Sequence, residues 1–171
     1  MLEVGAGHGA NFAHYPPEVT EVVAVEPEPT LRGLAENAAR SAPVRVVVVP
    51  GTAESLPGEG YDAAVASLVL CSVPDQAVAL SELRRVLGEG GELRFYEHVI
   101  ARRGPKRALL QLADRSGLWP KLAAGCHPAR DTAAAITAAG FDIVQCERIS
   151  FRGAPIEPAI PYILGSARVN G

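Results

Sequence analysis

The sequence lacks the features of a membrane-spanning, disulfide-rich or nucleic-acid-binding protein. No apolar run in the 171 residues approaches the roughly 20 residues that cross a bilayer, and the longest, 44–50, is interrupted by Arg45. There are only three cysteines, Cys71, Cys126 and Cys146, and this odd, scattered set excludes a disulfide framework. The net charge of −3 gives nucleic-acid binding no electrostatic support. We therefore expect a cytoplasmic protein without a nucleic-acid partner.

What the chain does have is enough apolar sequence for one globular core. It is 48% hydrophobic and 20% charged, which is typical of a folded domain. Its length fits one domain, so we expect residues 1–171 to fold as a single unit.

Short β-rich runs alternate with helical patterns over the first hundred residues. Between the strands, 29–41 and 75–87 have helical spacing, with Pro29 and Asp75 at helix starts and Gly88 at a helix end. Strand–helix–strand alternation at this pitch predicts βαβ units and a parallel sheet. The predicted strands are Met1–Val4, Glu21–Val25, Val44–Val49, Tyr61–Ser67 and Glu92–His98.

The last third of the chain departs from this alternation. Residues 104–117 and 130–139 are predicted helices, whereas 141–149 and 160–169 are predicted strands whose connection has no helical pattern. A parallel crossover needs about a dozen residues or more, usually a helix, so this last pair is predicted to be antiparallel. The fold class is therefore α/β, a doubly wound parallel sheet that ends in an antiparallel hairpin.

A glycine-rich loop, Glu3-Val-Gly5-Ala-Gly7-His-Gly9, follows the first strand. Such glycines allow a tight turn and let a ligand approach bare backbone. The second strand ends at Glu26, and an acid at that point can accept both hydroxyls of a ribose. These features together predict a nucleoside-containing cofactor across the carboxyl ends of the first two strands.

Two cofactors fit this loop. With Ala10 in the third position, the spacing also satisfies the dinucleotide fingerprint of NAD(P). Three features favour S-adenosylmethionine: Glu3 suits a cationic amino-acid cofactor better than a pyrophosphate, no Tyr-x-x-x-Lys pair is present, and 171 residues leave no room for a separate substrate domain. An NAD(P)-binding oxidoreductase stays as an alternative.

Further segments resemble class I S-adenosylmethionine-dependent methyltransferases of the type 11-like group. Gly51–Pro57 resembles their adenine-contacting loop, Tyr61–Asp75 their fourth strand and its loop, and Leu83–Gly91 the turn before their fifth strand. The resemblance implies S-adenosylmethionine as cofactor and a Rossmann-like seven-stranded sheet with an antiparallel last strand. Because this family carries helices ahead of the first strand, we expect the chain to be N-terminally truncated relative to the family.

A narrower likeness is to the methyltransferase-like group that methylates small alkyl thiols. It implies direct in-line methyl transfer to a small-molecule acceptor, with a thiol preferred, oxygen or nitrogen acceptors as alternatives, and no metal required. A non-catalytic cofactor-binding remnant is a further alternative. The segments that carry this likeness are Gly9–Phe12, Tyr15–Pro17, Leu68–Val73, Glu97–Val99 and Gly125–Cys126.

The resemblance also implies a role for individual residues at the cofactor. Glu3 and the glycine loop would hold the methionine amine, Glu26 the ribose hydroxyls, and Glu54 the adenine amine. The full predicted set is Glu3, Gly5, Ala6, Gly7, Gly9, Glu26, Pro27, Leu31, Ala53, Glu54, Ser67 and Leu68.

On the acceptor side, a free thiol has a pKa of roughly 8.5, so a base would raise its thiolate fraction at neutral pH. Glu97 and His98, at the end of the fifth predicted strand, are the candidate bases, with Asp75 and His127 as alternatives. The residues predicted to line the acceptor site are Cys71, Trp119, Cys126 and His127. The cysteines match no zinc pattern, because the neighbours Cys126 and His127 lack the usual gap between ligands.

One basic cluster, Arg102, Arg103, Lys106 and Arg107, precedes an apolar helical stretch. Such a run is usually a solvated helix start, and it is also compatible with contact with anionic lipid. The sequence gives no indication of the oligomeric state.

Overall fold

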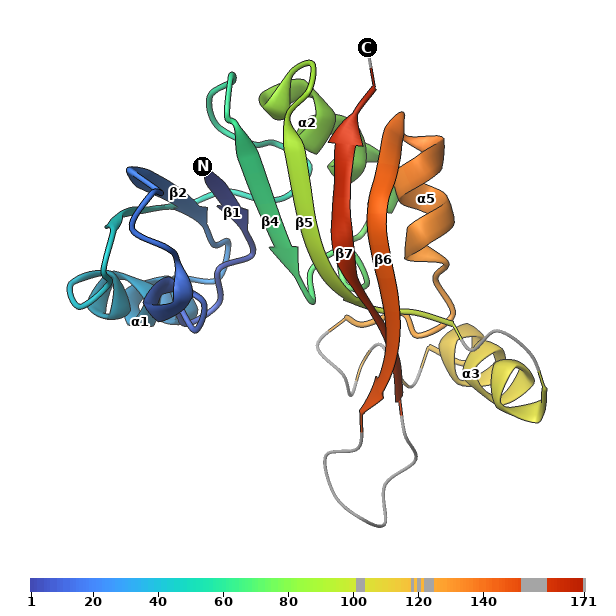
Figure 1. The fold of residues 1–171 in the computed structure, drawn as a ribbon. Coiled ribbons are helices and arrows are strands. Elements are labelled where there is room, and N and C mark those ends of the chain that lie inside the picture. The colour runs from blue at the N-terminus through green and yellow to red at the C-terminus, as the bar shows by residue number, and fades with distance from the viewer. Residues whose placement is uncertain (101–103, 118, 120, 122–124, 152–159, 171) are drawn as a thin grey trace.

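The computed structural model describes residues 1–100, 104–117, 119, 121, 125–151 and 160–170, which build one seven-stranded sheet (Figure 1). Its order is β3-β2-β1-β4-β5-β7-β6. The pairs among β1 to β5 are parallel, and β7 is antiparallel to both of its neighbours. The strands are β1 (Leu2–Val4), β2 (Glu21–Val25), β3 (Arg45–Val49), β4 (Ala63–Ser67), β5 (Glu92–His98), β6 (Phe141–Phe151) and β7 (Ile160–Val169). The predicted sheet and its antiparallel last strand are confirmed.

The helices begin and end close to the residues that the sequence indicates. Pro29 is the first residue of α1, although the capping side chain is that of Glu28. Asp75 caps α2, and Gly88, with φ +68°, ends it. The helical elements are η1 (Phe12–His14), α1 (Pro29–Ala39), α2 (Gln76–Leu87), α3 (Pro105–Arg115) and α5 (Thr132–Ala138).

Helices lie on both faces of the sheet: α2 and α5 lie behind β4 to β7 in Figure 1, whereas α1 packs at the end of the sheet that β2 and β3 form. The larger core lies on the face of α2 and α5, where Leu80, Leu83 and Ile136 are fully buried with Leu93 and Phe95 of β5. The smaller core lies on the opposite face, under α1, and comprises Ala6, Phe12, Ala24 and Ala35, with Val46 and Val48 packed against it. Helices on both faces make the sheet doubly wound, as predicted.

This topology brings the loops that the sequence singles out to one edge of the sheet. Because β1, β2, β4 and β5 are parallel, their carboxyl ends lie together. The glycine loop follows β1, Glu26 follows β2, the loop from Leu68 follows β4, and His98 ends β5. Ligands of doubly wound sheets bind at this edge, so it is where a site is expected.

In the described part of the chain, none of the helices has both the length and the apolar character of a transmembrane segment. Arg102 and Arg103 of the basic cluster lie outside the described residues.

Candidate functional site

A cavity of about 500 Å³ opens at the carboxyl ends of β1, β2 and β4. This volume lies within the range of sites for cofactors and other small molecules. The loop after β4 adds Val69, Ser72, Val73 and Pro74 to its lining. Most of the predicted cofactor-binding residues line it: Gly5, Gly7, Glu26, Pro27, Leu31, Ala53, Glu54 and Leu68.

Glu26 ties the glycine loop to the end of β2. The residue is only 5% exposed. Its Oε2 accepts a hydrogen bond from the Gly7 amide at 2.8 Å, and its Oε1 accepts one from the Glu28 amide at 2.9 Å. Each carboxylate oxygen has a second lone pair, so the side chain can still accept hydrogen bonds from a ligand in the cavity.

Glu54 brings a second acceptor to the cavity wall. Its Oε1 is buried and has no hydrogen-bond partner among the described residues. A buried polar atom without a partner costs about 1–3 kcal/mol. A donor on a ligand bound in this cavity would remove that cost.

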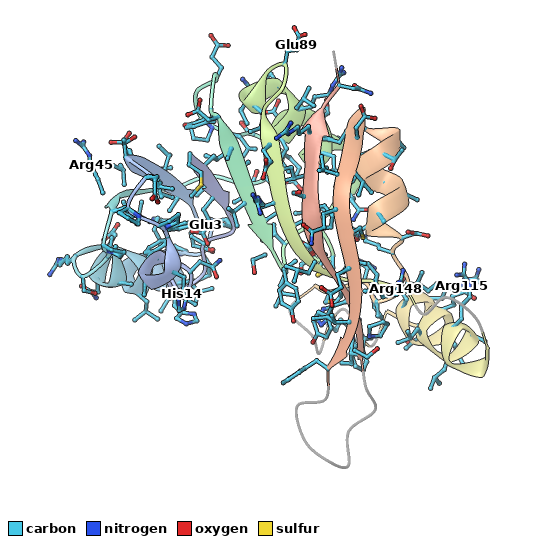
Figure 2. The ribbon with its side chains drawn as sticks, in the orientation of Figure 1. Glu3, His14, Arg45, Glu89, Arg115 and Arg148 are labelled. Carbon is cyan, nitrogen blue, oxygen red and sulfur yellow. The ribbon has the colours of Figure 1, made fainter. Side chains whose placement is uncertain are left out.

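The remaining predicted cofactor residues do not line this cavity: Glu3, Ala6, Gly9 and Ser67. Glu3 is buried beside the segment that carries η1 (Figure 2), where it accepts hydrogen bonds from Asn11 Nδ2 at 2.8 Å and from the Tyr15 hydroxyl at 2.7 Å. Burial raises the pKa of Glu3, against the effect of these two bonds. Ser67 lines a separate cavity of about 620 Å³, together with Asn11 and Tyr15.

The side chain of Glu97 holds the loop after β4 through hydrogen bonds to its backbone. This carboxylate is fully buried: Oε1 accepts the amides of Val69 and Leu70 at 3.0 and 2.9 Å, and Oε2 that of Cys71 at 3.0 Å. Burial raises the pKa of Glu97 well above its usual value. The loop begins at Leu68, whose φ of +60° is rare for a residue other than glycine. Glu97, a predicted base, thus lies under the cavity loop instead of lining the cavity.

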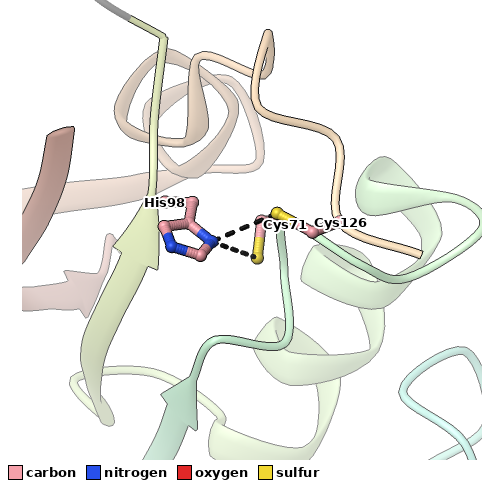
Figure 3. Close-up of side chains that lie close together, drawn as sticks. All are labelled: Cys71, His98 and Cys126. Carbon is pink, nitrogen blue, oxygen red and sulfur yellow. Dashed lines mark hydrogen bonds between the residues drawn. The ribbon is translucent and has the colours of Figure 1, made fainter. Parts of the chain in front are cut away.

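His98 forms a cluster with two of the three cysteines (Figure 3). Its Nδ1 lies 3.1 Å from Cys126 Sγ and 3.9 Å from Cys71 Sγ. Its Nε2 is buried without a hydrogen-bond partner in the described part of the chain, and its ring packs on Tyr162 at 4.4 Å between centroids. A hydrogen bond between the two thiols raises the pKa of Cys71 to about 12 and lowers that of Cys126.

The other residues predicted for the acceptor site lie further out. His127 Nδ1 is 2.9 Å from Asp114 Oδ1 of α3, and the His127 amide donates to the Cys71 carbonyl at 2.8 Å. Trp119, which follows α3 in the sequence, is half-buried. The structure therefore brings Cys71 and Cys126 together with His98, while His127 contacts this cluster through its backbone.

Comparison with known proteins identifies the family. The family model described as a methyltransferase domain matches residues 2–95. The thiol S-methyltransferase TMT1B of Rattus norvegicus is 36% identical over 174 residues, which cover 98% of this chain and 69% of the rat protein. The chain belongs to the methyltransferase domain family. Human thiol S-methyltransferase TMT1A is 33% identical, again over 98% of this chain and 69% of the human protein.

The fold of this methyltransferase is shared with solved structures of low sequence identity. The YcgJ protein of Bacillus subtilis superposes with a TM-score of 0.78 at 17% identity, over 99% of this chain and 91% of that one. A S-adenosylmethionine-dependent methyltransferase of Methanosarcina mazei gives 0.75 at 20% identity, with the same coverage. The predicted family is confirmed, and with it S-adenosylmethionine as the cofactor that the family indicates.

Some residues of the methyltransferase site were not predicted from the sequence. Arg130 Nη1 and Gln76 Nε2 both donate to the Leu70 carbonyl, at 2.8 and 3.0 Å, and so hold the cavity loop through a carbonyl, whereas Glu97 holds it through amides. Tyr162, which packs on His98, comes from β7. Arg130 and Tyr162 lie far along the chain from Leu70 and His98, and no local pattern indicates their contacts. Gln76 is only six residues from Leu70, where it is the first residue of α2.

The first and second glycines of the loop differ in what surrounds them, which gives a matched pair of variants. Both have positive φ, +64° at Gly5 and +57° at Gly7. A Cβ at Gly5 would overlap Cγ2 of Val69, whereas one at Gly7 would meet nothing within 4 Å. We expect Gly7→Ala of the methyltransferase to cost only the strain of a positive φ, about 1–2 kcal/mol. Gly5→Ala should cost clearly more, because the added Cβ also has to displace the β-branched side chain of Val69.

Thermal unfolding of the two variants without ligand measures this difference. A melting temperature for Gly5→Ala equal to that of Gly7→Ala would show that the contact between Gly5 and Val69 is not tightly packed.

Proposed function

We propose that the chain binds S-adenosylmethionine in the 500 Å³ cavity and transfers its methyl group to the thiol of a small molecule. We also propose that residues 1–171 act as a single domain, since one sheet runs through them. The names of the relatives support the thiol as acceptor. The observation that carries the proposal is the pair of acidic side chains, Glu26 and Glu54, on the wall of one cavity at the carboxyl edge of the sheet.

The cavity fits the chemistry of the nucleoside. Two ribose hydroxyls are donors, and Glu26 presents two carboxylate oxygens that each keep a free lone pair. The adenine amine is also a donor, and the buried Oε1 of Glu54 has no partner among the described residues. Pro27, Leu31 and Ala53 supply apolar contact. Gly7, with open space at its Cα, leaves room for a ligand against the backbone.

When bound, S-adenosylmethionine supplies an activated methyl group on a sulfonium, so the protein needs chiefly to position and desolvate the acceptor. Of the two predicted bases, Glu97 is fully occupied by three backbone amides, so we assign it a positioning role. His98 has one nitrogen facing two thiols and the other without a partner among the described residues, so we keep it on the acceptor side.

Calorimetric titration with S-adenosylhomocysteine, with NAD as a parallel control, tests the cofactor. We expect saturable, one-to-one binding of S-adenosylhomocysteine and no binding of NAD. Apart from Glu26 and Glu54, the lining of the cavity is mostly apolar, which does not suit the charged pyrophosphate of NAD. Binding of NAD alone would instead support the oxidoreductase alternative.

The acceptor is tested with propanethiol, propanol and propylamine, which differ only in the nucleophilic atom. We expect S-adenosylhomocysteine to be released with the thiol and not with the alcohol or the amine. Equal turnover of all three would contradict a thiol-specific site, and cofactor binding without any turnover would favour a non-catalytic protein.

A further inference from the structure

The two buried cysteines and His98 present three metal-binding atoms to one another. We propose that Cys71 Sγ, Cys126 Sγ and His98 Nδ1 bind a zinc ion, and that its fourth position takes the sulfur of the acceptor thiol. The second part rests on the proposed function, whereas the metal site itself does not.

The distances fit a tetrahedral ion. Zinc bonds of about 2.3 Å to sulfur and 2.0–2.1 Å to nitrogen place the ligand atoms roughly 3.5–3.8 Å apart. Here Nδ1 lies 3.1 and 3.9 Å from the two sulfurs, and all three atoms lie within 4.8 Å of one another. Shifts of less than about 1 Å therefore suffice to close the site around zinc. Sulfur and imidazole ligands select zinc over magnesium or calcium, which prefer oxygen.

Three separate elements hold the ligands in place. The amide of Cys71 is bound by Glu97, and its carbonyl accepts the amide of His127, the neighbour of Cys126. His98 is the last residue of β5 (Figure 3). Its ring packs on that of Tyr162. Both cysteines are buried. Ligands that are fixed before the ion arrives lose little freedom on binding it, which favours a high affinity.

Three protein ligands with one position left open are the pattern of a catalytic zinc, whereas structural sites have four. Cys71 lies in the loop whose Leu68, Val69 and Ser72 line the cofactor cavity, so one loop contributes both to the cluster and to the cavity. Cys71 and Cys126 would bind the ion as thiolates, each releasing its proton to solvent. A thiol R–SH that takes the open position would displace a water from zinc, form a Zn–S bond and lose its proton to solvent, since zinc keeps a coordinating thiol deprotonated. The bound sulfur retains lone pairs with which it can act as a nucleophile.

The first test is zinc binding by the full chain, stripped of metal and titrated with Zn²⁺ against a chromogenic chelator. We expect one ion per chain. Cys126→Ser and His98→Gln should each weaken binding at least about 100-fold, since the loss of an outer-shell partner alone costs up to about 100-fold and these residues make direct metal bonds. Cys146→Ser is the matched control, since this third cysteine is exposed on β6 and should leave the affinity unchanged. Thermal melts verify that each variant folds.

Cobalt then tests the open position, because Co²⁺ adopts the same geometry and gives visible bands. We expect a thiolate-to-cobalt charge-transfer band in the wild type and in Cys146→Ser, and a clearly weaker band at saturating Co²⁺ in Cys126→Ser, which keeps only Cys71 as a thiolate ligand. Propanethiol should shift the cobalt bands, whereas propanol should not.

The outcomes separate this inference from the proposed function. Absence of metal binding in the wild type, or equal binding by Cys126→Ser and Cys146→Ser, overturns the zinc site even where S-adenosylhomocysteine binds. Zinc binding without any binding of S-adenosylhomocysteine would support the metal site and contradict the proposed function. Metal binding without a response to propanethiol would overturn the role of the fourth position.

Discussion

Glu26→Ala should lower the affinity for S-adenosylhomocysteine by at least about 100-fold. The variant removes the carboxylate that we propose accepts both ribose hydroxyls, and hydrogen bonds to a charged group are worth about 1.5–3 kcal/mol each. Two such bonds amount to at least about 3 kcal/mol, and each 1.4 kcal/mol is a factor of ten in affinity. Calorimetry with S-adenosylhomocysteine measures the change.

Glu28→Ala is the control for this prediction. Glu28 lies two residues further along and is exposed, and its carboxylate caps α1 by accepting the amides of Thr30 and Leu31 at 2.9 and 2.7 Å. Its loss should weaken the start of α1 while leaving the cofactor affinity unchanged, because its side chain does not line the cavity. Unchanged affinity in Glu26→Ala, or an equal loss in Glu28→Ala, would refute the ribose assignment.

The fold could be predicted because the signals that define it are local. Asp75 caps the start of α2 and Gly88 its end, both through contacts within the helix's own turns. The spacing of the apolar residues Leu80 and Leu83 determines which face of α2 is buried. The position of Glu26 also follows from local order, since the topology of parallel strands places the residue after β2 at the ligand edge. Sequence and structure agree wherever the partners are close in the chain or fixed by strand order.

The parts of the site that sequence did not indicate depend on distant partners. Glu97 looks like a base at a strand end, yet its acceptors are filled by amides 26 to 28 residues away. Cys71 and Cys126 match no metal-binding spacing, because the chain between them includes α2, β5 and α3. His98 reaches both sulfurs only once the sheet has formed. Such contacts are set by tertiary packing, and no periodic pattern in the sequence indicates them.

Glu97→Ala should be the most destabilising change at the site. It leaves the amides of Val69, Leu70 and Cys71 buried without their acceptor, at about 1–3 kcal/mol for each group. A total of at least about 3 kcal/mol would lower the melting temperature by roughly 6–12 °C for a chain of this size. The variant should also bind S-adenosylhomocysteine more weakly, since Val69 lines the cavity. Thermal unfolding and calorimetry measure the two effects.

Two further variants distinguish a positioning role of Glu97 from a role as base. Glu92→Ala, at the other end of β5, removes only ion pairs with Arg94 and Arg168 at the surface, worth about 0–1 kcal/mol, and should melt near the wild type. Glu97→Gln keeps the volume and one acceptor oxygen but presents an amide group to one backbone donor, so its melting temperature should fall between those of wild type and Glu97→Ala. If Glu97 acted as a general base, the variant Glu97→Gln would give a different result. Glu97→Gln would then melt like the wild type and lose turnover alone, because the missing group would be a proton acceptor and not the support of the cavity loop.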